Sequence, residues 1–88
     1  MSEENQVIDL CRALIAGGDK WLSVSAILKG LQEQEAESCR RAVLGYCNAV
    51  LLKSDNPRAA EVIYEFEHEV FNSGWPSLTA ACYRLMLK

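Results

Sequence analysis

The chain lacks the sequence features of most catalytic and metal-binding classes. It has a single histidine, His68, and none of its four cysteines belongs to a CxxC pair, so the usual zinc-ligand spacings are missing. It also has no glycine-rich phosphate loop and no nucleophile elbow. We therefore expect a protein that is not an enzyme and that requires no cofactor, metal ion or small-molecule ligand.

An excess of basic residues and a long apolar run are missing as well. The net charge of −3 argues against strong non-specific DNA binding by this domain alone, because that affinity comes from clustered Lys and Arg. No apolar run approaches the roughly 20 residues that span a bilayer. The acidic start MSEENQ differs from the basic beginning of a signal peptide. We expect a soluble, cytoplasmic protein with no membrane partner.

The size and composition predict one domain over residues 1–88. Half of the 88 residues are apolar, which is enough for one core but not for a catalytic domain with its own cofactor fold. The cysteines lie in apolar helical patterns and are expected to be small core residues. Cys39 and Cys47 would lie about 12 Å apart on one helix, too far for a disulfide or a shared zinc ion.

The stretch SCRRAVLGYCNAVLLK, from Ser38 to Lys53, is the most continuous apolar segment. Between Ala42 and Leu52 only Gly45 and Asn48 interrupt the apolar side chains. A helix that is apolar on nearly all sides is normally buried among its neighbours. The sequence therefore predicts a buried central helix over about 36–53.

The remaining segments predict four more helices and no strand. Apolar residues recur at helical spacing over 3–16, and Gly17-Gly18 ends that segment. A second helix should begin near Ser23, or a few residues earlier, and reach Leu31. Asn56 and Pro57 form a start signal for a helix over about 57–72. The segment Trp75-Pro76-Ser77 is expected to start a last helix over 78–87. The predicted fold class is an all-α, single five-helix bundle.

An acidic ridge is predicted on the fourth helix. Glu61, Glu65 and Glu69 stand four residues apart, with Glu67 beside them, and like charges at this spacing repel on a helix. The ridge is a candidate surface for a basic partner. The alternative is a solvated face that keeps the domain soluble.

Three arginines and one tryptophan complete the candidate interface residues. Arg40 and Arg41 lie in the first turns of the central helix, where the helix dipole disfavours cations, and Arg58 lies at the start of the next helix. They are candidates for a subunit interface or for contacts with acidic groups, the alternative being solvated charge. Trp75, like Trp21 and Tyr83, is expected in the core or at its boundary, and in an exposed patch any of them would mark an interface.

Residues 40–83 resemble the C-terminal helical region of phage and prophage P-loop ATPases related to the clamp-loader subunits of DNA polymerase III. The resemblance rests on the RRAVLGY block, the AVLLK ending, the NPRAA start of the next helix, and the turn with Phe66, Phe71, Ser73 and Gly74. The segment before it, with Lys20-Trp21 and an amphipathic helix to Leu31, fits more loosely.

The resemblance implies a collar-like domain that holds ATPase subunits together in a replication assembly. Its partners would then be copies of itself or ATPase subunits, and DNA contact would be indirect, through the assembly. The chain has none of the ATP-hydrolysis motifs of a whole loader subunit, so the resemblance fits an excised domain or a free-standing protein equally well. The alternatives are a helical adaptor that binds a protein partner and, with the least support, a helix-turn-helix DNA-binding regulator.

Overall fold

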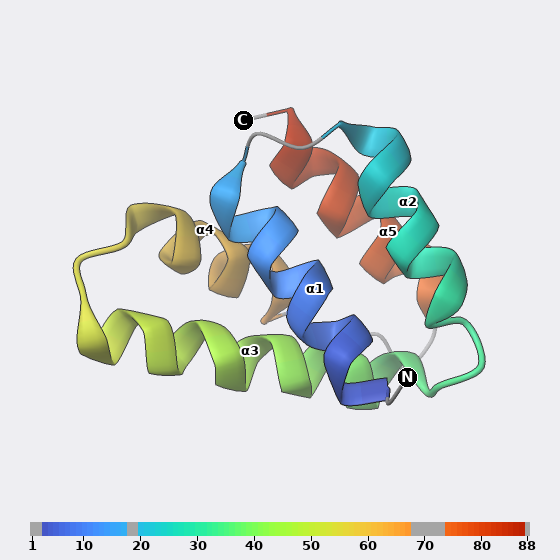
Figure 1. The fold of residues 1–88 in the computed structure, drawn as a ribbon, viewed down its shortest axis with the longest axis horizontal. Coiled ribbons are helices and arrows are strands. Elements are labelled where there is room, and N and C mark those ends of the chain that lie inside the picture. Colours follow the sequence, from blue (N-terminus) through green and yellow to red (C-terminus); the bar gives the residue numbers. More distant parts are fainter. Residues whose placement is uncertain (1–2, 18–19, 68–73, 88) are drawn as a thin grey trace.

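The computed structural model describes residues 3–17, 20–67 and 74–87, and across these ranges it contains five α-helices and no strand. The all-α prediction is therefore confirmed. The helices are α1 (Glu3–Ala16), α2 (Trp21–Gly30), α3 (Ala36–Lys53), α4 (Pro57–Phe66) and α5 (Trp75–Met86) (Figure 1).

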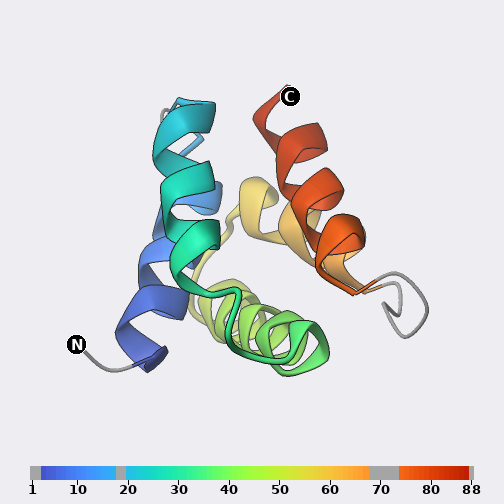
Figure 2. The ribbon, with the colours of Figure 1, turned by 90° about the vertical axis from the view of Figure 1, so that its right-hand side faces the viewer.

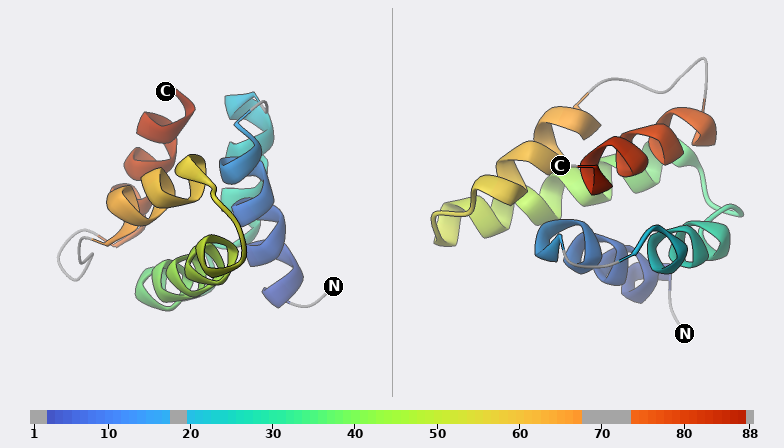
Figure 3. Two further views of the ribbon diagram at one scale, coloured as in Figure 1. Left: turned by 90° about the vertical axis from the view of Figure 1, so that its left-hand side faces the viewer. Right: turned by 90° about the horizontal axis from the view of Figure 1, so that it is seen from above.

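The helices pack as a bundle in which α1 and α5 make the most connections. Each of these two helices contacts all of the other four, whereas α2 and α4 do not contact each other. Helix α3 runs along one side of the bundle (Figure 1), and α2 and α5 rise from it on either side when the molecule is turned (Figure 2). Seen from above, α4 and α2 lie at opposite edges (Figure 3, right).

Local signals in the sequence explain where several helices begin and end. The Asn56 side chain accepts a hydrogen bond from the Ala59 N–H at 3.1 Å, and Pro57 occupies the first helical position, as predicted. Gly17 has a φ of 71°, the left-handed conformation expected after α1. The predicted bounds of α1 and α3 are confirmed.

Helix α2 begins at Trp21, as predicted for a start a few residues before Ser23, whereas two other boundaries differ from prediction. Helix α5 begins at Trp75, slightly earlier than expected. Helix α4 ends at Phe66 rather than near Asn72. The predicted remainder of that helix falls mostly on residues 68–73, which lie outside the described residues.

The prediction that α3 is buried on all sides is wrong. Its buried residues form one stripe that includes Cys39, Val43 and Cys47, and Gly45 and Asn48 are exposed. Alanine and glycine dominate the apolar part of its outer face, and exposing such small side chains costs little. The apolar run therefore produced an amphipathic surface helix with a narrow buried stripe.

The core is formed by all of the helices together. Side chains with almost no solvent exposure come from α1, α2, α3, α4 and α5, as predicted for the helical periodicities: Leu10, Leu14, Val24, Val43, Val62, Phe66, Leu78 and Leu85. None of the helices in the described ranges combines the length and apolar character needed to cross a bilayer.

Candidate functional site

Arg58 joins the ends of two helices that are distant in the sequence. It lies in the first turn of α4, where its Nε donates to the carbonyl of Leu14 at 2.8 Å and its Nη2 donates to the carbonyl of Leu85 at 2.6 Å. Both carbonyls lie in the last turns of their helices, where no further turn supplies an N–H partner. The cation also complements the negative ends of the helix dipoles of α1 and α5.

Arg40 binds backbone carbonyls at the other end of α4, as Arg58 does at the ends of α1 and α5. Its side chain is buried, with a residue exposure of 7%, and its Nη1 donates to the carbonyls of Phe66 and Glu67 at 2.9 and 3.2 Å. Its Nε donates to Glu37 Oε1 at 2.8 Å, and its Nη2 donates to Glu37 Oε2. The buried charge is thus paired with a carboxylate and hydrogen-bonded to backbone, which burial of an ion requires.

The three predicted interface arginines do not form one cluster. Arg40 and Arg41 share the Glu37 carboxylate, with Arg41 Nε at 3.1 Å from Oε2. Arg58 lies at the opposite end of α4, a ten-residue helix about 15 Å long. The structure gives Arg40 and Arg58 internal contacts that hold helix ends, while the Arg41 side chain is 71% exposed. An interface role for these residues stays a prediction.

The acidic ridge is less uniform than its spacing suggested. Glu61 is exposed, whereas the Glu65 side chain is only 10% exposed and its Oε1 accepts from Arg84 Nε at 2.9 Å. This contact links α4 to α5. Glu69 lies outside the described residues. A basic partner for the ridge also stays a prediction.

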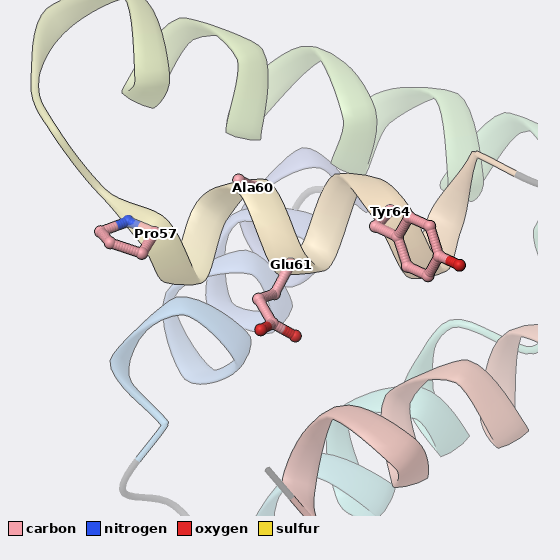
Figure 4. A pocket seen from close by; sticks show the side chains of 4 residues that line it. All are labelled: Pro57, Ala60, Glu61 and Tyr64. Atoms are coloured by element: carbon pink, nitrogen blue, oxygen red, sulfur yellow. The ribbon is translucent and has the colours of Figure 1, made fainter.

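An open hollow of about 460 Å³ lies along the outer face of α4. It is lined by Pro57, Ala60, Glu61 and Tyr64, whose side chains project from successive turns (Figure 4). Carbon atoms of proline, alanine and the tyrosine ring make the surface largely apolar, with the carboxylate of Glu61 in its middle. Such a surface fits a protein side chain better than it fits a small polar substrate.

The aromatic residues that the sequence placed at the core boundary make internal contacts. Trp75 is half-buried, and its Nε1–H donates to the carbonyl of Gln34 at 2.9 Å, which attaches the start of α5 to the connector before α3. The rings of Trp21 and Tyr83 meet edge to face, with centroids 5.1 Å apart. This pair attaches the start of α2 to α5.

The four cysteines are buried and free, which confirms their prediction as core residues. The neighbouring thiol of Cys47, together with burial, raises the pKa of the Cys11 thiol. Burial raises the pKa of Cys39 to about 11 and that of Cys82 to about 12. Within the described residues no group of three or more His, Cys, Asp and Glu is arranged to hold a metal ion.

The sequence reasoning did not single out several large apolar side chains that lie on the surface. Leu22 is 79% exposed and Leu87 is 72% exposed, and the same group includes Leu52 and Tyr64. Tyr83, which was expected in the core or at its boundary, is exposed as well. A signal was available for Leu22, which falls outside the helical pattern formed by Val24, Ile27 and Leu28. An apolar residue off the buried stripe of an amphipathic helix faces water or a partner.

No protein-family model, no curated protein and no solved structure matches this chain. Inference about its function therefore rests on the residues and their arrangement.

The contacts of Arg58 predict that its guanidinium, and not only its charge, stabilises the fold. Arg58→Lys keeps the charge but loses the forked donors, leaving at least one helix-end carbonyl without its partner, and we expect a loss of about 1–3 kcal/mol of unfolding free energy. Urea denaturation followed by circular dichroism measures this change. As the matched control, Arg41→Lys should change stability by less than about 0.5 kcal/mol. Equal stability of wild type and Arg58→Lys would contradict the assignment.

The Arg40–Glu37 contact predicts a specific loss of stability in acid. Hydrogen bonds from Arg40, with a smaller contribution from Arg41, lower the pKa of the Glu37 carboxyl from 4.5 to about 2. Because the folded-state pKa is depressed, the stabilisation is complete above pH 4.5 and is lost as the pH falls towards 2. The stability difference between wild type and Glu37→Gln should shrink over that window in urea denaturation. A difference that is constant with pH would show that the carboxylate charge contributes nothing.

Proposed function

We propose that this chain is a subunit-association domain of the collar type found in clamp-loader ATPases, and that it acts by joining protein subunits rather than by catalysis. Its partners are further copies of the chain or the ATPase subunits of a replication assembly. Contact with DNA is then indirect, through that assembly.

The observation that carries this proposal is the set of large apolar side chains on the surface. Leu22 lies on α2, Leu52 on α3, Tyr64 on α4, and Tyr83 near the end of α5, with Leu87 following that helix. Each keeps a large apolar area in water that association would remove, at roughly 25 cal/mol per Å². Their distribution over several helices suits a subunit that has neighbours on more than one side.

The arginines and cysteines inside the molecule make structural contacts, which supports a non-catalytic role. Arg40 and Arg58 bind backbone carbonyls at helix ends. The cysteines are buried, and burial raises the pKa of Cys39 and Cys82, which disfavours the nucleophilic thiolate. The contacts of these groups inside the bundle favour a structural role for them.

The resemblance of residues 40–83 to clamp-loader-type ATPases gives the association a biological setting. In those proteins the C-terminal helical domain joins subunits, and ATP hydrolysis belongs to preceding domains.

The two other candidate functions have less support. The adaptor reading needs a continuous acidic ridge, but Glu65 contacts Arg84. The DNA-binding reading needs a polar or basic helix face, but the exposed face of α3 includes Gly45, Ala49 and Leu52.

Self-association in solution tests the proposal. Light scattering over a wide range of protein concentrations, at low and high salt, should show a mass that rises from that of the 9.8 kDa chain to a defined multiple of it. Apolar contacts predict that a measurable part of this association persists at high salt. The mass of a single chain at every concentration would contradict the proposal that copies of the chain are its partners.

A further inference from the structure

The four free cysteines lie in one part of the core. Cys11 is on α1, Cys39 and Cys47 are on α3, and Cys82 is on α5. These three helices contact one another. All four side chains belong to the same core cluster, and each has at most 1% of its surface exposed. Four oxidisable groups are therefore gathered where α1, α3 and α5 meet.

Cys11 and Cys47 are the neighbouring pair within this group. The Cys47 thiol lies next to that of Cys11, on the facing helix, whereas Cys39 and Cys82 affect Cys11 only through charge at longer range. Cys39 lies two helical turns from Cys47 on α3, about 12 Å away, which is beyond the span of a disulfide. The structure therefore favours one pair of thiols, on two different helices, for a covalent link.

We propose that Cys11 and Cys47 form an oxidation site, at which a hydroperoxide converts the two thiols into a disulfide that joins α1 to α3. The oxidant is a small molecule that carries an O–O bond, and hydrogen peroxide is the simplest member of its class. This site is a property of the bundle itself and does not depend on which partners the chain binds in the proposed function.

The first step oxidises Cys47. Its thiolate sulfur attacks one oxygen of hydrogen peroxide, so that an S–O bond forms and the O–O bond breaks. The second oxygen leaves as hydroxide, takes up a proton and departs as water. Cys47 is then a sulfenic acid, which condenses readily with a nearby thiol.

The second step uses the thiol of Cys11. Its sulfur attacks the sulfur of the Cys47 sulfenic acid, the S–S bond forms and the S–O bond breaks. The hydroxide that leaves takes the proton of the Cys11 thiol and becomes a second water. In total, two thiols lose two electrons and two protons, and one hydrogen peroxide is reduced to two waters.

The pairing of the two thiols favours this reaction over oxidation of a single buried cysteine. A neighbouring thiol can share its proton with a thiolate, so a pair loses its first proton more readily and its second less readily than separate groups do. Accordingly, Cys11 lowers the pKa of Cys47, and Cys47 raises the pKa of Cys11. By contrast, burial raises the pKa of Cys39 and Cys82, which disfavours their reactive thiolates.

The disulfide should stabilise the folded bundle. It closes a loop that contains α2 and the starts of the helices on either side of the link, and such a loop restricts the unfolded chain. We expect oxidation to raise the midpoint of thermal unfolding by at least about 8 °C. Reduction with dithiothreitol should return the midpoint to its starting value, which circular dichroism measures for both forms.

Peptide mapping identifies the linked cysteines directly. Cleavage after lysine and arginine places the four cysteines on four different peptides, residues 1–12, 30–40, 42–53 and 59–84. The folded, reduced chain is treated with hydrogen peroxide, its remaining thiols are alkylated, and it is digested with trypsin. The intact mass should fall by the mass of two hydrogen atoms. The main cross-linked product should join peptides 1–12 and 42–53.

Two controls separate the effect of the fold from that of the sequence. In concentrated urea, loop closure favours the cysteines closest in sequence, so the main disulfide should join Cys39 to Cys47. In the folded chain, Cys11→Ala should abolish the cross-linked product. Cys82→Ala removes a different buried thiol from the same cluster and should leave the product unchanged. Circular dichroism verifies that both variants fold, and the map of the wild-type chain needs neither of them.

The proposal is supported if the folded chain gives the Cys11–Cys47 link and the unfolded chain does not. It is overturned if another pairing or a disulfide between two chains is the main product of the folded protein. Sulfinic acid without a cross-link, or survival of all four thiols, would overturn it as well. A Cys11–Cys47 link that lowers the unfolding midpoint would show that the folded bundle does not accommodate the bond, and the proposal would then also fail.

Discussion

Helices α1, α4 and α5 each end on carbonyl groups that accept hydrogen bonds from an arginine of another helix. The last carbonyls of a helix have no partner within it, and in a domain this small they lie close to the core. Neither α1 nor α4 has a basic residue in its own last turn, so each depends on a cation from elsewhere. Arg58 and Arg40 supply these cations and thereby fix the positions of helices that are distant in the sequence.

The parts of the fold that depend on local sequence were predictable, and those that depend on distant contacts were not. Asn56, Pro57 and Gly17 mark helix boundaries through their own chemistry, and apolar periodicity identified the core of each helix. The bonds of Arg58 join it to carbonyls 44 and 27 residues away. No local pattern reveals such partners, so the sequence predicted neither the contacts of Arg58 nor those of Arg40 with the carbonyls of Phe66 and Glu67. The contact of Arg40 with Glu37 does agree with the predicted contacts to acidic groups. The burial of α3 was overestimated because alanine and glycine count as apolar in a sequence but tolerate exposure.

The structure divides its charged residues between two tasks. Arg40, Glu37 and Arg58 lie against the backbone of the bundle, where they determine how helices meet. Lys20, Lys29 and Glu61 are exposed at the edges, where they affect what approaches the molecule. This division means that the outer charges can be altered with little effect on the packing of the bundle.

The buried cysteines can be used to detect opening of the helical bundle. Cys11 on α1, Cys39 and Cys47 on α3, and Cys82 on α5 are all free and shielded from solvent. A thiol reagent can modify them only when the helices separate, so the modification rate follows the population of opened molecules rather than the reactivity of the thiols. Because the four thiols are distributed over three helices, the order in which they are modified would distinguish the local release of one helix from cooperative unfolding of the whole bundle.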